Sequence, residues 1–229
     1  MTIAIGARCQ DGVALVADRR MVRLGGLEIS APDVKLRQTG GVIFARVGVQ
    51  PFYDALEKVL FEEDVVTCWD VGDTVDALVD RYQAFRDDSP VFPLAMVSER
   101  QANLYQMTAG FPPAKVLYQV WGIAEEYGSI GRIFPWEETP VDVAWKVLVL
   151  FVRAAARASV AVGDGVDSAL IRDNGQIEVV DDTTAVWEES DGVIDQMVAL
   201  FRMRMEVPEV TRWIESLADD RVVRMSEST

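Results

Sequence analysis

The chain has 229 residues, half of them hydrophobic, so it is long enough to bury a core of its own. Lysine and arginine total 22 against 37 aspartates and glutamates, and the resulting net charge of −15 opposes binding to nucleic acid or to an anionic membrane surface. The complete absence of histidine excludes the Ser-His-Asp triad, the Cys-His pair and metal sites built on imidazole.

The first part of the chain predicts β-strands. Short apolar runs at 2–8 and 12–18 are joined by a turn whose Asp-Gly pair, residues 11–12, favours a tight reversal. Two further strands are expected over 34–38 and 42–47, on either side of a glycine-containing turn. We therefore predict that strands open the chain, beginning with a hairpin.

Helical periodicity replaces strand alternation in the next segment. One apolar stripe runs from Phe52 to Leu60 and a second from Val75 to Phe85, which predicts two helices.

Extended runs return at 92–98, 103–107 and 116–122, and they predict a second group of strands. The sequence Phe-Pro-Pro at 111–113 is interpreted as a break in the path between the last two runs.

The clearest helical pattern of the sequence covers residues 141–158, where apolar side chains fall on one face. The segment that begins at Thr139 resembles a capped helix start. A hairpin is predicted next, with strands at 166–172 and 176–180 and an Asn-Gly turn at 174–175.

The C-terminal part predicts a last helix over about 194–205, a shorter one near Trp213 and a frayed tail from about residue 225. No change in composition marks a boundary, so we predict one domain over 1–229. Strand groups alternating with helices indicate two sheets packed face to face with helices outside, and a single mixed sheet gives a similar pattern.

The sequence also bears on the location of the protein. No apolar run reaches the roughly 18 residues of a membrane span, and no basic region precedes the first apolar stretch. Cys9 and Cys68 are too few for a secreted disulfide framework or a thiolate zinc site, and we interpret both as core residues. We expect a cytoplasmic protein without cofactor or metal.

Thr2 supplies the base that histidine would otherwise provide. Methionine aminopeptidases accept a small second residue, so removal of Met1 would leave Thr2 with a hydroxyl and a free α-amine. Such an amine has an unperturbed pKa of about 7.7–8.0 and accepts a proton at neutral pH. The alternative is that Thr2 is only the first residue of a strand.

The segment that follows the predicted hairpin turn carries a family resemblance. Residues 12–20, Gly-Val-Ala-Leu-Val-Ala-Asp-Arg-Arg, resemble the opening of proteasome-type, β-subunit-like N-terminal nucleophile (Ntn) hydrolases. Residues 33–36, Asp-Val-Lys-Leu, resemble the segment with the family's catalytic lysine, and residues 46–48 resemble its glycine-bearing strand end. The resemblance implies an α/β (α+β) fold, a four-layer αββα sandwich of two packed, mainly antiparallel sheets.

The resemblance also implies roles for four residues. Thr2 is the nucleophile, Lys35 lowers the proton affinity of its surroundings, Asp18 holds Lys35, and the amide of Gly48 contributes the oxyanion hole. The alternatives are an ordinary ion pair between Asp18 and Lys35 and a turn glycine at Gly48.

Arg46, two residues before that glycine, is similar in position to the family residue at the floor of the pocket for the residue preceding the scissile bond. An arginine there predicts a preference for acidic side chains. The alternative is that Arg46 pairs with an acidic residue of its own chain.

Two segments depart from the family pattern. The family's Gly-Ser-Gly reads Gly-Ile-Ala at 122–124, and a rival alignment places Gly-Ser-Ile of 128–130 there. The family's Asp followed by Ser-Gly corresponds to 159–163, where Ser159 and Val162 stand in those positions. The missing groups support the amine and the lysine by hydrogen bonds.

The resemblance and these departures leave three functions open. The first is a threonine-type peptidase or amidohydrolase acting on peptide or protein substrates. The resemblance implies that it assembles as a homo-oligomer, a ring or a dimer of rings, because chains of this family bury helix faces against neighbouring subunits. The second is a catalytically silent proteasome-like subunit for assembly, gating or binding. The third is a transpeptidase or ligase that uses the same acyl-enzyme.

Overall fold

The computed structural model describes residues 3–19, 21–22, 28–29, 34–48, 50–62, 67–82, 90–122, 131, 134–158 and 165–180. The helices predicted at 194–205 and near Trp213, and the tail from 225, lie outside the described residues.

Two five-stranded sheets form the centre of the fold, and all paired neighbours within them are antiparallel. The first sheet has the order β10 (Tyr118–Gly122), β1 (Ile3–Arg8), β2 (Gly12–Asp18), β11 (Val166–Arg172), β12 (Ile177–Val180). The second has the order β5 (Leu36–Thr39), β6 (Val42–Ala45), β7 (Val91–Ser98), β8 (Gln101–Thr108), β9 (Phe111–Lys115). A separate two-stranded ribbon joins β3 (Met21–Val22) and β4 (Glu28–Ile29).

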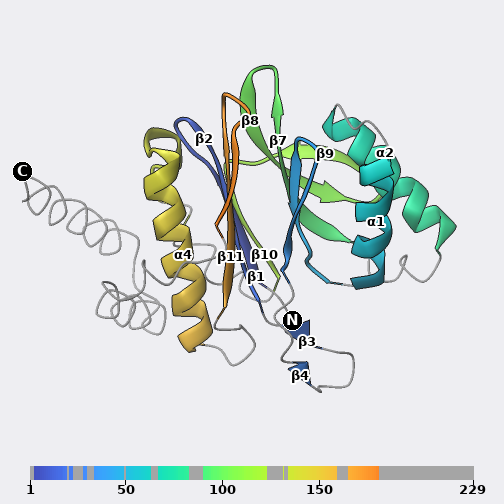
Figure 1. Ribbon diagram of the computed structural model, residues 1–229, viewed down its shortest axis with the longest axis horizontal. Coiled ribbons are helices and arrows are strands. Elements are labelled where there is room, and N and C mark those ends of the chain that lie inside the picture. The colour runs from blue at the N-terminus through green and yellow to red at the C-terminus, as the bar shows by residue number, and fades with distance from the viewer. Residues whose placement is uncertain are drawn as a thin grey trace, which may run out of the picture.

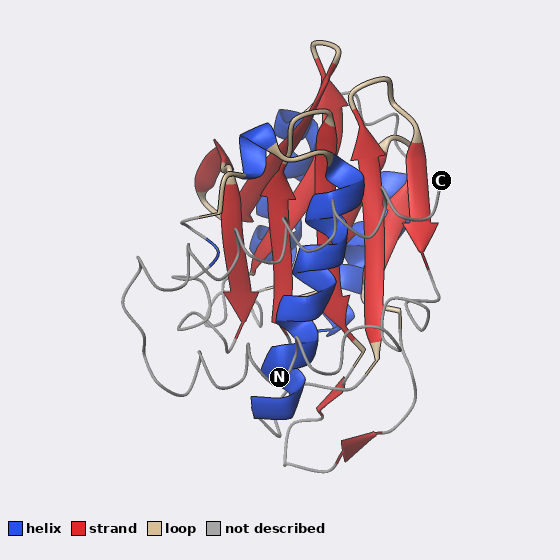
Figure 2. Cartoon of the chain, turned by 90° about the vertical axis from the view of Figure 1, so that its left-hand side faces the viewer, coloured by secondary structure: helices blue, strands red, loops and turns tan. Residues whose placement is uncertain are grey.

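Helices cover the outer faces of both sheets (Figure 1). On the second sheet lie α1 (Gln50–Glu62) and α2 (Cys68–Arg81), and on the first lies α4 (Val141–Ala158), preceded by the short 3-10 helix η2 (Trp136–Glu138). Figure 2 shows α4 in front of the first sheet, covering its outer face. This is the predicted four-layer αββα sandwich.

Three apolar layers hold the four structural layers together. Successive side chains of a strand point to opposite faces of its sheet, so each sheet contributes to two of these layers. In β6, Val42 and Phe44 pack toward α1 and α2, whereas Ile43 and Ala45 pack between the sheets. The face of α4 that contains Leu148 packs on the first sheet. The period-two and period-3.6 patterns of the sequence are thus matched by the layers that bury them.

The apolar stripes of α1 and α2 pack on the second sheet, where Phe52, Leu56 and Val75 are buried. These stripes are therefore buried within the chain itself, and the expected homo-oligomer has to use other side chains of these helices. The large apolar side chains that these helices leave on the surface are instead Phe61, 80% exposed, and Trp69, 57% exposed. None of the described helices is long and apolar enough to cross a membrane.

The segment 111–113, interpreted from sequence as a break, is the start of strand β9. This strand lies at the edge of the second sheet and pairs only with β8, with a register shift between Gln106 and Thr108. Proline lacks an N–H donor, and an edge strand tolerates this because one of its sides has no ladder partner.

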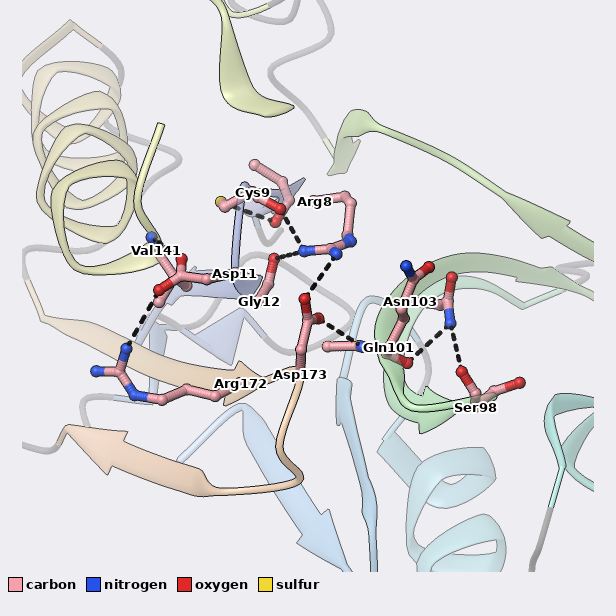
Figure 3. Close-up of polar contacts among 12 residues, drawn as sticks. Arg8, Cys9, Asp11, Gly12, Ser98, Gln101, Asn103, Val141, Arg172 and Asp173 are labelled. Atoms are coloured by element: carbon pink, nitrogen blue, oxygen red, sulfur yellow. Dashed lines mark hydrogen bonds and ion pairs between the residues drawn. The ribbon is translucent and has the colours of Figure 1, made fainter. Parts of the chain in front are cut away.

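The start of α4 is capped from a distant turn. The Thr139 hydroxyl, expected to cap the helix, donates to the carbonyl of Pro135 at 2.8 Å. The cap comes from Asp11 in the β1–β2 turn, whose carboxylate accepts the N–H of Val141 at 2.8 Å (Figure 3). The predicted tight turn therefore also fixes the helix on the sheet.

Candidate active site

Strand ends of both sheets meet where the candidate residues lie. In the first sheet, β1 begins at Ile3, β2 ends at Asp18, and β11 begins at Val166, opposite Asp18. In the second sheet, Lys35 directly precedes β5. Antiparallel pairing thus places residues far apart in sequence at one end of the sandwich.

Asp18 and Lys35 form a buried ion pair. Lys35 Nζ lies 2.7 Å from Asp18 Oδ1, and the two side chains are 3% and 0% exposed. The same carboxylate oxygen accepts the backbone N–H of Ile3 at 2.9 Å. Because Ile3 is bonded to Thr2 in the chain, one carboxylate ties the ammonium group to the residue that follows the expected nucleophile.

The backbone of Lys35 is held by a second carboxylate. The N–H of Lys35 donates to Asp167 Oδ2 at 2.6 Å, and Arg19 Nε donates to Asp167 Oδ1 at 2.5 Å. Burial raises the pKa of Asp167 above its ordinary value, against the opposing effects of the hydrogen bonds from Lys35 and Arg19. Two carboxylates and two cations therefore share this end of the sandwich.

Sequence reasoning missed Asp167 and Arg19. The signal for Asp167 was a carboxylate in the second position of a predicted strand with an apolar centre, because a charge buried in such a strand needs partners. The signal for Arg19 was its place directly after Asp18.

Gly48 lies three residues after the end of β6, and strand pairing brings Arg46 of the same segment beside Lys35. The N–H of Arg46, two residues earlier, donates to the carbonyl of Lys35 at 2.9 Å. Gly48 has a φ of +115°, and a Cβ there would meet no atom within 4 Å. The glycine is thus required by backbone conformation and not by crowding, and its N–H stays a predicted oxyanion donor.

The guanidinium of Arg46 points toward α1. Arg46 Nη2 lies 2.6 Å from Glu57 Oε2 and 3.2 Å from Asp54 Oδ1. The pairing with acidic residues of its own chain, considered from sequence as the alternative, is therefore present, and a role of Arg46 toward substrate stays a prediction.

Several sequence predictions lie outside the described residues. These are Thr2 itself, most of the segment 122–124, the segment 128–130, and residues 159–163. Within the described part of the chain, no group of three or more Cys, Asp or Glu side chains is placed to hold a metal ion.

Three solved structures show what this arrangement resembles. Anbu (ancestral beta-subunit) from Yersinia bercovieri matches with a TM-score of 0.70 and 15% identity over 87% of this chain and 96% of that one. The chain has a proteasome-like Ntn-hydrolase fold. A mutant of Anbu from Hyphomicrobium sp. strain MC1 matches with a TM-score of 0.70 and 17% identity over 90% of this chain and 98% of that one.

A second crystal form of Anbu from the same Hyphomicrobium strain matches with a TM-score of 0.65 and 15% identity, covering 89% of this chain and 98% of that one. No family model matches the sequence, and no curated protein does. The Anbu structures therefore establish the fold, while the chemistry must be argued from this chain's own residues.

Proposed function

We propose that this protein is a proteasome-like, threonine-type peptidase or amidohydrolase in which Thr2 becomes the N-terminal nucleophile after removal of Met1. The observation that carries the proposal is the double use of Asp18 Oδ1, which accepts both Lys35 Nζ at 2.7 Å and the N–H of Ile3 at 2.9 Å. The pair is buried, so its charges act through little solvent.

The proposed reaction needs only groups of the chain and water. The α-amine of Thr2 takes the hydroxyl proton, and the hydroxyl oxygen attacks the carbonyl carbon of the amide. The carbon–nitrogen bond then breaks, the leaving amine takes the proton, and an ester to Thr2 remains, which water hydrolyses.

Two groups of the site assist this reaction. The ammonium of Lys35 keeps the amine neutral and favours the alkoxide, since a nearby positive charge disfavours protonation. The N–H of Gly48 donates to the oxyanion that forms on the carbonyl.

Arg46 would give this enzyme a preference for acidic residues before the scissile bond. Its pairing with Glu57 and Asp54 competes with substrate, so the expected preference is modest in the unchanged protein. Glu57→Gln should strengthen it and Arg46→Ala should abolish it, measured with fluorogenic peptides that differ only at that residue. Equal turnover of acidic and apolar peptides by all three proteins would remove Arg46 from the account.

We further propose a homo-oligomer, a ring or a dimer of rings, that acts in the cytoplasm without a cofactor. The assembly is supported by the fold shared with a protein described as an ancestral β-subunit and by the exposed Phe61 and Trp69. The location is supported by the two cysteines, which are both free thiols. Light scattering should return a multiple of the 25.4 kDa chain mass, and a monomer at micromolar concentration would reject the assembly.

The decisive experiment on function combines intact mass with covalent labelling. Protein expressed without an N-terminal tag should lack Met1 and should gain one adduct from a peptide epoxyketone, which requires both the hydroxyl and the amine of an N-terminal threonine. Thr2→Ala should lose Met1 as well, because alanine is also small, but should gain no adduct. Retention of Met1 in the unchanged protein would end the threonine mechanism.

A catalytically silent subunit is the second candidate, and a specific observation favours it. The two family segments that support the amine and the lysine are replaced, with Ser159 and Val162 in the second of them. A protein that loses Met1, assembles and still takes no label would be explained by this candidate.

A further inference from the structure

Asp167 joins the two sheets at the candidate site. Its carboxylate accepts the N–H of Lys35 at 2.6 Å through Oδ2, and it accepts Arg19 Nε through Oδ1. Asp167 belongs to β11 of the first sheet, whereas Lys35 leads into β5 of the second. The side chain is 2% exposed, so the contact is buried.

Strand register explains why this side chain reaches Lys35. Asp167 lies opposite Ala17 of β2, and residues directly opposite in an antiparallel pair point to the same face. Ala17 belongs to the apolar layer between the sheets. Asp167 therefore faces the second sheet, in a layer where a carboxylate is costly unless it is paired.

We propose that Asp167 is a positioning residue for the threonine mechanism, which fixes the backbone of Lys35 so that its ammonium group stays on Asp18 beside the start of β1. This inference rests on the proposed function. It adds a second anchor for the lysine, at the backbone, to the one that Asp18 provides at the ammonium group.

Charge balance makes the inference testable. The described charged groups around Asp167 are Asp18 and Arg19 at the end of β2 and Lys35 before β5. Asp167→Asn removes a negative charge, so the pKa of the Thr2 amine should fall and the acid limb of the pH–rate profile should move to lower pH. Arg19→Gln removes a positive charge, and the limb should move to higher pH.

The test measures the rate of Thr2 acylation by a β-lactone, followed by intact mass over about two pH units on either side of the usual amine pKa. Four proteins are compared: the unchanged chain, Asp167→Asn, Arg19→Gln, and Asp173→Asn as the matched control. Asp173 also follows the pattern of one backbone N–H and one arginine on its carboxylate, but at the opposite end of β11.

The plateau rate of Asp167→Asn should fall by on the order of 10- to 100-fold, because a small displacement of a catalytic group is enough for that loss. Asp173→Asn should keep both the plateau and the limb. Opposite limb shifts for Asp167→Asn and Arg19→Gln would show that the charges of this cluster act on the Thr2 amine. The lower plateau of Asp167→Asn, absent from Asp173→Asn, would report the displacement of Lys35.

The outcomes separate this inference from the proposed function. Superimposable profiles for the unchanged protein and Asp167→Asn, or limb shifts of the same sign in Asp167→Asn and Arg19→Gln, would overturn the role of Asp167 and leave the threonine mechanism intact. An unchanged protein that is not acylated at any pH would overturn the proposed function, and this inference with it. If Asp167→Asn does not fold, the Arg19→Gln profile decides, and an unmoved limb there would overturn the inference.

Discussion

Strand β11 has an aspartate at each end, and the two make the same kind of bridge between the sheets. Asp167, near its start, accepts the N–H of Lys35 and the side chain of Arg19. Asp173, directly after its end, accepts the N–H of Ala102 in β8 at 2.9 Å and lies 3.1 Å from Arg8 (Figure 3).

The two bridges differ in burial and in what they hold. The side chain of Asp167 is 2% exposed and that of Asp173 is 31% exposed. Asp167 holds a lysine whose ammonium is paired with a buried carboxylate, whereas Asp173 holds an alanine of a hairpin. The same pattern of hydrogen bonds therefore has two uses. At Asp173 it only links the two sheets, whereas at Asp167 it also belongs to a buried cluster of charged side chains.

The largest expected difference between the ends comes from removing one cation at each. Lys35→Met leaves the Asp18 carboxylate buried without its cation and should lower the free energy of unfolding by about 3–5 kcal/mol. Arg8→Met breaks a more exposed pair and should cost about 1 kcal/mol. Urea unfolding measures both, and adding Asp18→Asn to Lys35→Met should recover part of the loss. Equal costs at the two ends would break the comparison.

The second prediction concerns pH. Because burial raises the pKa of Asp167 above 3.8, the folded state binds more protons than the unfolded state between the two pKa values. Stability is therefore lost as pH rises through that window, by about 1.4 kcal/mol for each pKa unit. Asparagine does not titrate, so Asp167→Asn has no such loss of stability between about pH 4 and about pH 7. The difference in unfolding free energy between the unchanged protein and Asp167→Asn should therefore be smaller at about pH 7 than at about pH 4. If that difference in unfolding free energy did not depend on pH, the raised pKa of the buried Asp167 carboxyl would be contradicted.

The third prediction tests the opposite end, where Asp11 caps α4. Asp11→Ala removes the acceptor for the N–H of Val141 and should lower the free energy of unfolding by about 1 kcal/mol. Thr139→Val, which removes a hydroxyl that does not cap the helix, should cost less. A larger loss for Thr139→Val would restore the cap that the sequence suggested.

The smallest expected effect lies in the β7–β8 turn, next to Ala102. Glu99 and Arg100 have φ values of 55° and 64°, which side chains other than glycine and asparagine adopt with strain. Glu99→Asn with Arg100→Gly should raise the free energy of unfolding by about 0.5 kcal/mol. Glu99→Gln with Arg100→Lys, which keeps the strain, should leave it unchanged, and equal stability of the two double variants would contradict the explanation.

Local patterns predicted most of the fold. The Asp-Gly and Asn-Gly turns gave both hairpins of the first sheet, and the apolar stripe of 141–158 gave α4 with its observed bounds. Strand β9 was not predicted over its first residues, because two prolines there were interpreted as a break. An edge strand tolerates proline. The cap of α4 was missed since Asp11 is distant in sequence.

The candidate site was predicted unevenly for a similar reason. The Asp18–Lys35 pair followed from a resemblance to a family motif and is present in the structure. Asp167 belongs to no such motif, and only the register of β11 against β2 brings it to Lys35. Contacts between strands far apart in sequence depend on sheet register and packing, and local patterns in a single sequence do not reveal them.

Thr2, supported by Asp18 and Lys35, is the proposed nucleophile, and peptide mapping of the β-lactone adduct is the strictest test of that role. Tandem mass spectrometry of the N-terminal peptide should show a chain that begins at Thr2 and carries the acyl group on that residue, and Lys35→Met should carry little or none. A chain that still begins at Met1 would contradict this role. An acyl group on another residue, formed at the same rate in the unchanged protein and in Lys35→Met, would contradict it as well.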